Sequence, residues 1–415
     1  MLIPDSPVQV PDQGNSPQPV VGLRPELAGK KLAFVLKIAS RCNLNCSYCY
    51  VYNKGDETWR ARPALMGDHV VDAALDRIRE WCIQSGQDEV RITFHGGEPL
   101  LAGRARLDRF ARRCRDRLKE IGQVQFNIQT NGTLIDEAWA DLFAEHEIEV
   151  GISLDGPAEV HDSTRVDHKG RGSYERVARG IEILAKRGVW AGALAVIKFG
   201  ADGVAIHRHI RSLGFRNVNY LLPDFTHDTV AEIHRMHGPT PCADYLVPLF
   251  DEWWFNDTCD VRIPLFIAIT RLLLGGRSNI DMVGNEAFGF VFLEADGAIE
   301  DLDALRVCRN GMAATKLSVF THQIGDVRAL SDLHRAAMFD GLPVPTKCAA
   351  CPEALTCSGG YLPHRWSDST GFDNPSIWCA DLLKLFTHIR GRLEVDGEET
   401  HLRRQALAGV GLEAR

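Results

Sequence analysis

The feature that most constrains the fold of this chain is an alternation of strand-like and helix-like segments between Lys31 and Pro223. Six apolar runs predict strands, at residues 32–39, 90–95, 124–130, 150–155, 189–198 and 218–222. Between them lie amphipathic stretches such as residues 70–82, whose apolar side chains share one helical face. Strands that alternate with helices form a parallel sheet with right-handed crossovers. The pattern therefore predicts an α/β fold, a partial (β/α)6 barrel of the TIM type.

Polar or glycine-bearing motifs follow five of the predicted strands. They are the cysteine loop 42–49, Gly96-Gly97-Glu98-Pro99, Thr130-Asn131-Gly132, Ser153-Leu154-Asp155-Gly156 and Pro223-Asp224. In a parallel barrel the carboxyl ends of the strands build the active site. Glycine turns also end strands for structural reasons alone, but five such motifs on one rim indicate a functional site.

The cysteine loop places Cys42, Cys46 and Cys49 within eight positions. Soft thiolates at this spacing suit zinc or an iron–sulfur cluster. A structural zinc site usually has four protein ligands, and no fourth ligand is obvious beside these three. Three cysteines would instead leave one iron of a cluster open to an outside ligand, so the pattern favours iron–sulfur over a structural zinc site.

The CxxxCxxC spacing, with Tyr48 just before the last cysteine, resembles the signature of the radical S-adenosyl-L-methionine (SAM) superfamily. The resemblance implies a 4Fe-4S cluster whose open iron is chelated by SAM. An electron from the cluster then splits SAM into methionine and a 5′-deoxyadenosyl radical. The resemblance also implies a set of SAM-binding residues, which are Tyr48, Gly96, Gly97, Glu98, Pro99, Ser153, Arg165 and Val196.

Within that set, residues 96–99 would receive the methionine amino group, Ser153 and Arg165 would contact ribose and carboxylate, and Tyr48 and Val196 would border the adenine. Elementary chemistry agrees for the first motif. The Glu98 carboxylate can accept from an ammonium group, and glycines let the backbone approach a ligand closely.

A second cysteine group follows near the C-terminus, made of Cys348, Cys351, Cys357 and Cys379. Four thiolates could close a tetrahedral zinc site, and that alternative stays open. The pattern also resembles the SPASM extension of peptide-modifying radical SAM enzymes, whose full form has seven cysteines and two auxiliary clusters. Here Tyr361 stands where a further cysteine would be, so we expect one auxiliary 4Fe-4S cluster. Cys308 is interpreted as structural.

The changes in pattern divide the chain into five parts. We expect a proline-rich tail at residues 1–30, the radical SAM partial barrel at 31–225 and a helical bridge at 226–288. A smaller cysteine-rich, SPASM-like domain is expected at 289–386, starting with a hairpin at 290–302, and a helix and tail at 387–415.

The C-terminal phrase from Gly359 to Arg365, with residues 371–375 and 379–381, resembles the cyclophane-forming radical SAM/SPASM peptide maturases. The resemblance implies a ribosomally made precursor peptide as substrate and an external electron donor of the flavodoxin or ferredoxin type. The implied product is a crosslink from an aromatic ring carbon to the Cβ of a residue two positions away. Candidates for the catalytic proton acceptor, by position, are Asp224, Asp303 and His364.

Other functions stay open. An anaerobic sulfatase-maturing enzyme, which oxidises Cys or Ser to formylglycine, is the nearest alternative. Against it, Arg309 follows Cys308 where that family would place a catalytic Asp, and the cysteine count is reduced. Thioether formation and epimerisation are further alternatives. An inactive, metal-bearing peptide-binding protein is a different class, which the intact cysteine triad opposes.

Composition excludes some partners and indicates a compartment. A net charge of −8 leaves no electrostatic footprint for nucleic acid or an anionic membrane. No apolar run approaches the roughly 20 residues that span a bilayer. Residues 1–27 are polar and proline-rich, unlike a secretory signal. Twelve cysteines without an export signal indicate reduced thiols, and hence the cytoplasm.

Overall fold

The computed structural model of the 415-residue chain describes residues 27–257, 260–278, 280–300 and 302–409. All six predicted strands form: β1 (Ala33–Ala39), β2 (Glu89–Gly96), β3 (Gln123–Thr130), β4 (Ile148–Ser153), β5 (Ala191–Val196) and β6 (Val218–Leu221). They lie side by side in chain order, and each pairs in parallel with the next. The predicted α/β fold with a parallel sheet is therefore confirmed. The predicted tail at 1–30 lies almost wholly outside the described residues.

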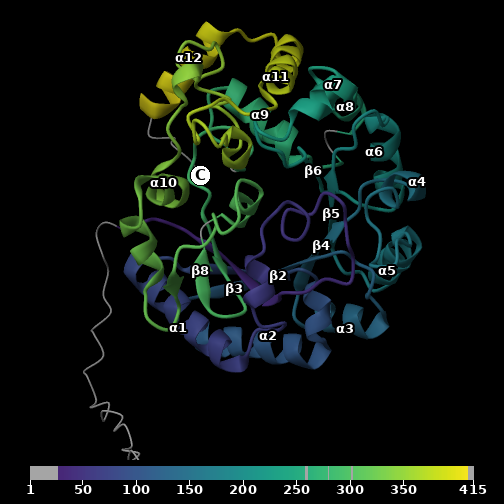
Figure 1. Cartoon of the computed structure of the whole chain (residues 1–415), viewed down its shortest axis with the longest axis vertical. Helices are drawn as coiled ribbons and strands as arrows, with labels where there is room; N and C mark the ends of the chain where they lie inside the picture. The colour runs from purple at the N-terminus through teal and green to yellow at the C-terminus, as the bar shows by residue number, and fades with distance from the viewer. Residues whose placement is uncertain (1–26, 258–259, 279, 301, 410–415) are drawn as a thin grey trace, which may run out of the picture.

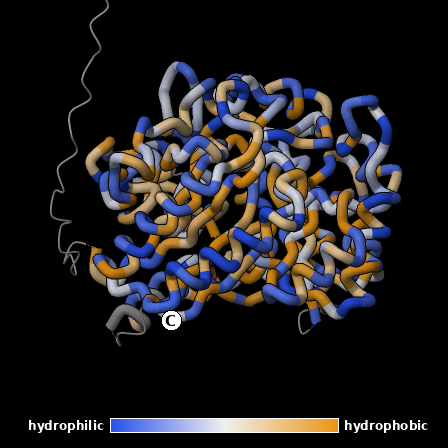
Figure 2. The backbone as a smooth tube through the Cα atoms, turned by 90° about the horizontal axis from the view of Figure 1, so that it is seen from below, coloured by the Kyte–Doolittle hydropathy of each residue, from blue (hydrophilic) through white to orange (hydrophobic). Residues whose placement is uncertain are grey.

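Helices connect these strands and lie along the outside of the sheet (Figure 1). They are α1 (Asp68–Ser85), α2 (Arg104–Leu118), α3 (Glu137–Glu145), α4 (Ala158–His161), α5 (Tyr174–Lys186) and α6 (Gly203–Ser212). In α1 the predicted apolar face is buried, including Val71, Leu75 and Ile78. The helix ends at Gly86, whose φ of 72° permits the left-handed cap. Orange and blue segments alternate along the backbone in Figure 2, as helices buried on one face require.

The segment expected as a bridge contains α7 (Ala231–His237), α8 (Pro241–Glu252) and α9 (Pro264–Leu273). Helix α8 packs against both α6 and the C-terminal helix α11 (Cys379–Leu393). Asp381 of α11 accepts hydrogen bonds from the first amides of α8, at Cys242 (2.7 Å) and Ala243 (2.8 Å). Since free N–H groups at a helix start need acceptors, this carboxylate ties the C-terminal region to the bridge.

The predicted hairpin at 290–302 forms as β7 (Phe290–Leu293) and β8 (Ala298–Glu300), but it belongs to the same sheet as the barrel. Strand β7 pairs in parallel with β1, β8 pairs antiparallel with β7, and the short β9 (Leu317–Ser318) ends the sheet. An open barrel leaves the outer edge of β1 unpaired, and β7 satisfies those backbone groups. The expected domain boundary at 289 therefore falls within one continuous nine-stranded sheet.

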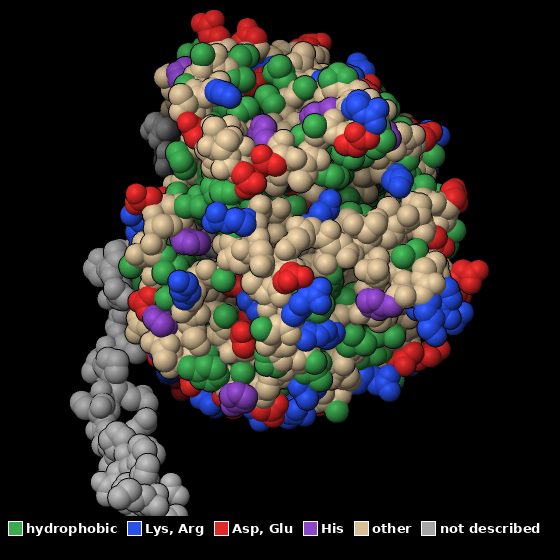
Figure 3. All heavy atoms as spheres, viewed as in Figure 1, with side chains coloured by type: hydrophobic (Ala, Val, Ile, Leu, Met, Phe, Trp, Pro, Cys, Tyr) green, Lys and Arg blue, Asp and Glu red, His purple; other side chains and the backbone are tan. Residues whose placement is uncertain are grey.

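The C-terminal region adds α10 (Asp332–Arg335), α11 and α12 (Gly397–Gly409), joined by irregular turns (Figure 1). Cys82, predicted as a core residue, is 1% exposed. On the face shown in Figure 3 both signs of charge are interspersed. Among the described residues, no helix has the length and apolarity to cross a membrane.

Candidate active site

The cysteine loop follows β1 and lies at the carboxyl end of the sheet. Cys42, Cys46 and Cys49 line one cavity of about 250 Å³. Burial raises the pKa of Cys42 to about 12 and that of Cys46 to about 11. The free thiols are therefore neutral at physiological pH, and a bound metal would have to replace their protons.

The cavity wall comes from the ends of five strands and the cysteine loop. It includes most of the predicted SAM-binding residues, namely Tyr48, Gly96, Gly97, Ser153, Arg165 and Val196. Asp224, predicted as a catalytic candidate, lies on the same wall. The structure thus brings together residues that are up to 182 positions apart in the sequence, from Cys42 to Asp224.

Glu98 and Pro99 are not part of this wall. Glu98 is fully buried, and its carboxylate accepts hydrogen bonds from the Leu100 amide (2.9 Å), the Thr130 hydroxyl (2.7 Å) and the Asn131 amide (2.8 Å). Burial raises its pKa to about 7. These bonds brace two neighbouring strand ends. Among the described residues, Oε2 accepts only the Asn131 bond and can accept one more, so the use of this side chain as an acceptor for a ligand ammonium stays a prediction.

The two glycines of the same motif pack against the cysteine loop. A Cβ on Gly96, whose φ is 140°, would lie 2.0 Å from the Ala39 carbonyl oxygen. A Cβ on Gly97 would lie 1.9 Å from the Tyr52 hydroxyl and 2.6 Å from the Arg41 carbonyl oxygen. Only glycine lets the two loops approach this closely. The motif therefore sets the height of the cysteine loop above the sheet.

Asp155 organises the side of the cavity expected to hold the nucleoside, and sequence reasoning did not assign it a role. Its carboxylate accepts from the Tyr48 hydroxyl (2.6 Å), from Arg165 Nε (2.9 Å) and Nη2 (3.2 Å), and from the Val196 amide (3.0 Å). The Arg165 guanidinium also lies 5.2 Å from the centroid of the Tyr48 ring. The sequence signal that could have identified Asp155 is its place just after β4, next to Gly156.

Asn131, also without an assigned role, holds the cysteine loop from the end of β3. Its amide nitrogen donates to Asn43 Oδ1 (2.8 Å) and lies 3.8 Å from Cys42 Sγ. Ser153 accepts from Gln129 Nε2 (3.1 Å), so its hydroxyl hydrogen is free to face the cavity.

Two of the three predicted catalytic side chains meet. His364 Nε2 lies 3.1 Å from Asp224 Oδ1, and His364 is fully buried. Tyr361 stands edge-on to the imidazole, with ring centroids 5.0 Å apart. Burial raises the pKa of Asp281 to about 6, with Asp224 adding to the effect. Asp224 lies on the cavity wall, and an imidazole and a phenol lie behind it.

Asp303, the third candidate, does not reach the cavity wall. It forms a close ion pair with Lys37, and both side chains are buried. Burial opposes ionisation, but the Lys37 ammonium outweighs it and lowers the pKa of Asp303. An ionised, paired carboxylate is a poor proton acceptor, so the catalytic role expected for Asp303 does not fit. Tyr50, which does line the cavity, is hydrogen-bonded to it.

The second cysteine group lies where a turn meets the first residue of α11. Cys348, Cys351, Cys357 and Cys379 line one cavity of about 40 Å³, several times the roughly 10–15 Å³ that a single water needs. Cys308 lies apart and donates to the Pro363 carbonyl oxygen (3.7 Å). The structure thus separates the four predicted ligands from the cysteine interpreted as structural.

The spacing of the sulfurs distinguishes a cluster from a single ion. Zinc with Zn–S bonds of about 2.3 Å places its sulfur ligands roughly 3.8 Å apart. In the described part of the chain, neither cysteine group brings three sulfurs within 4.8 Å of one another. No three sulfurs of either group are thus as close together as one tetrahedral ion would hold them, which favours a larger metal–sulfur group.

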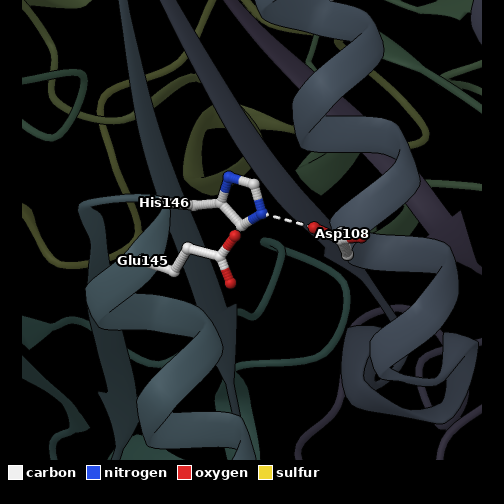
Figure 4. Close-up of side chains that lie close together, drawn as sticks. All are labelled: Asp108, Glu145 and His146. Carbon is white, nitrogen blue, oxygen red and sulfur yellow. Dashed lines mark hydrogen bonds and ion pairs between the residues drawn. The ribbon is translucent and has the colours of Figure 1, made fainter.

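Asp108, Glu145 and His146 do place three ligand atoms within 4.8 Å (Figure 4). However, these side chains already have cationic or hydrogen-bonding partners. His146 Nε2 bonds Asp108 (2.7 Å), Arg112 bonds both acids (2.8 and 2.5 Å), and Arg115 donates to His146 Nδ1 (3.0 Å). The group is an ion-paired contact between α2 and α3, in which both ring nitrogens of His146 are already bonded.

Residues 36–213 match the Radical SAM superfamily. The chain is 29% identical over 371 residues to a cysteine-type anaerobic sulfatase-maturating enzyme of Clostridium perfringens, covering 87% of this chain and 97% of that protein.

Two solved structures share the fold. Native anSMEcpe with bound AdoMet has a TM-score of 0.74 at 22% identity, covering 87% of this chain and 98% of that one. SuiB of Streptococcus suis bound to precursor peptide SuiA has a TM-score of 0.52 at 14% identity, covering 80% of this chain and 72% of that one.

Proposed function

We propose, from the premise that this chain is an enzyme built on a radical SAM domain, that it modifies a peptide or protein by removing hydrogen from a side-chain Cβ. One observation carries the proposal. One cavity is lined by all three cysteines and by Asp224, whose Oδ1 lies 3.1 Å from His364 Nε2. When bound there, SAM and a 4Fe-4S cluster supply the radical that removes the hydrogen atom.

The first candidate product is formylglycine, made from a Cys or Ser of a sulfatase-type protein. The whole-length similarity to a sulfatase-maturating enzyme supports it, and the comparisons fit this alternative better than cyclophane formation. Removal of one hydrogen atom, one further electron and one proton converts Ser directly to the aldehyde. The same loss from Cys gives a thioaldehyde, which water hydrolyses to formylglycine with release of H₂S. Asp224, which lines the cavity and has His364 behind it, is our candidate for the proton acceptor.

The second candidate is the three-residue cyclophane. Two observations favour it. Arg309 follows Cys308, at the position where the sulfatase-maturing family would place a catalytic Asp. The guanidinium of Arg309 lies over the Trp366 ring, 5.6 Å from its centroid. Tyr361, which replaces an expected cysteine, is buried beside His364. An aromatic product would need the same loss of one electron and one proton after the ring is attacked.

The residues of the chain position the substrate and cofactor. Asp155 would hold Tyr48, Arg165 and the Val196 amide in one arrangement against SAM. Cys348, Cys351, Cys357 and Cys379, which line one cavity, would hold an auxiliary 4Fe-4S cluster as electron acceptor. The external electron donor, the domain boundaries and a cytoplasmic location stay predictions.

The test is anaerobic reconstitution followed by iron analysis and a product assay. We expect about eight irons per chain, and about four in a Cys42→Ala/Cys46→Ala/Cys49→Ala variant. The reduced enzyme is then given SAM and a sulfatase-derived peptide with Cys or Ser at the target position. Formation of 5′-deoxyadenosine together with labelling by an aldehyde-reactive probe would support formylglycine.

A second peptide, with an aromatic residue two positions from an aliphatic residue, distinguishes cyclophane formation from formylglycine formation. Loss of two hydrogens without aldehyde labelling would indicate a crosslink. If no iron depends on the triad, or if the reduced protein does not cleave SAM, the proposed function is contradicted.

A further inference from the structure

Four arginine side chains of the described chain are buried, and one of them differs from the others. Arg62 pairs with Glu294 and Glu300, Arg165 with Asp155, and Arg306 with three carboxylates. Arg365 is 1% exposed, and among the described residues it forms no ion pair. A buried cation without a counter-charge is costly, so the place of Arg365 calls for an anion nearby.

The hydrogen bonds of Arg365 all go to backbone carbonyl oxygens. Nε and Nη2 donate to Gly360 (2.9 and 2.7 Å), Nη2 also to Ser358 (2.7 Å), and Nη1 to Pro343 (3.0 Å). These bonds fix the guanidinium in one position without neutralising it. The chain around residues 357–360 is therefore wrapped around a fixed positive charge.

That positive charge lies directly behind the second cysteine cavity. Gly359 lines the cavity, and a Cβ on Gly359 would lie 3.1 Å from Arg365 Cζ. Only glycine backbone therefore separates the guanidinium from the cavity at this point. Burial lowers the pKa of Arg365 to about 10, while charge on Cys357 and Cys348 opposes that shift. The group stays charged at neutral pH, and the nearest anions that act on it are two of the four thiolates.

A cluster bound by four thiolates carries net negative charge, and reduction adds one more electron to it. A fixed cation in a low-dielectric site stabilises the reduced form more than the oxidised form. We propose that Arg365 is the counter-charge of the four-cysteine site and holds the auxiliary cluster at a potential where it can take an electron from the substrate radical. This proposal rests on the proposed function, since it requires a cluster and an electron acceptor there.

The electron balance is complete within that scheme. The substrate radical loses one electron to the oxidised cluster and one proton to a base, and the cluster is reduced by one electron. Within the described residues, all hydrogen bonds of Arg365 go to backbone carbonyl oxygens and none to a cysteine sulfur, so it acts as a positioning and tuning residue rather than a catalytic one.

The experiment uses the full chain with the Cys42→Ala/Cys46→Ala/Cys49→Ala change, so that only the second site can hold iron. Its cluster is titrated anaerobically and followed by electron paramagnetic resonance, with Arg365 intact, as Arg365→Lys and as Arg365→Gln. We expect Arg365→Gln to shift the reduction equilibrium at least tenfold toward the oxidised form, which is about 59 mV for one electron. Arg365→Lys, which keeps the charge, should shift it much less.

Lys347→Gln is the matched control, because it removes an exposed positive charge next to Cys348. Water screens that charge, so the control should leave the potential nearly unchanged. An Arg365→Gln protein with a full cluster and an unshifted potential would overturn the proposal.

Loss of the cluster is also informative. A cluster that assembles with Lys at position 365 but not with Gln would support the need for charge. Failure of both variants would mean that the hydrogen bonds to Gly360 matter and the charge does not, which overturns the proposal. Zinc in place of iron would overturn the auxiliary cluster and its tuning, whereas the triad and its SAM cleavage, measured separately in the unaltered enzyme, would remain as evidence for the proposed function.

Discussion

Asp155→Asn is the most direct test of how the cavity is built. The change keeps the shape of the side chain but removes the charge that faces Arg165, which is 6% exposed. The new amide N–H₂ would also meet the guanidinium N–H groups, donor against donor. Removing one partner of a buried ion pair costs about 3–5 kcal/mol, because the other charge stays buried. The loss should also loosen Tyr48 and the Val196 amide.

Asp76→Asn is the control, since it makes the same chemical change in an exposed pair. Asp76 lies 2.9 Å from Arg117, and both side chains are 48% exposed. Such a pair contributes at most about 1 kcal/mol. Urea unfolding of the reduced, metal-free proteins, followed by circular dichroism, compares the two variants.

Binding of SAM to the reconstituted proteins gives a second measure. We expect Asp155→Asn to weaken it strongly while the iron content stays unchanged, because no cysteine ligand bonds Asp155. A double variant, Asp155→Asn with Arg165→Met, should be less unstable than the sum of the single changes, since it removes the stranded charge. If Asp155→Asn unfolds at the same urea concentration as Asp76→Asn, the role given to this carboxylate is wrong.

Three further predictions concern other parts of the site. Asp224→Asn should retain cleavage of SAM but lower product formation by about 10²–10⁴, the usual contribution of a general base; equal loss of both activities would contradict a proton-acceptor role. Gly97→Ala should weaken SAM binding at least tenfold, measured by equilibrium dialysis, because its Cβ would displace Tyr52 or Arg41; unchanged affinity would show that the contact is not rigid. Burial, and then Arg165, lower the pKa of His161 to about 4 from 6.5, so this group stabilises the fold above pH 6.5 and the stabilisation is lost as pH falls toward 4. Urea midpoints should therefore drop across that window, and drop less in His161→Gln.

Much of the barrel could be predicted from sequence because its signals are local. Each strand is an apolar run, each helix has a buried face within its own residues, and right-handed crossovers then fix the order β1 to β6. The cysteine triad is local as well, since eight consecutive positions contain all three thiols. The resemblance to the radical SAM superfamily, rather than any local pattern, implied that Ser153, Arg165 and Val196 lie near them.

The remaining features depend on contacts that no local pattern records. The sequence of β7 contains no sign that it pairs with β1, because the open edge it fills exists only once the barrel has formed. The sequence did not show that the Glu98 carboxylate is buried against Thr130, since the side of a tight loop that a side chain takes depends on its neighbours.

Residues far apart along the chain show the same limit. Asp224 and His364, which are in contact, are 140 positions apart in the sequence. The lack of an ion-pair partner for Arg365 could be recognised only once the positions of the surrounding charged side chains were known. The sequence by itself determined the elements and the chemistry of the cysteines, because those depend on neighbouring residues. Only the tertiary structure decided which polar groups share a buried space, because burial and charge pairing are properties of the packed molecule.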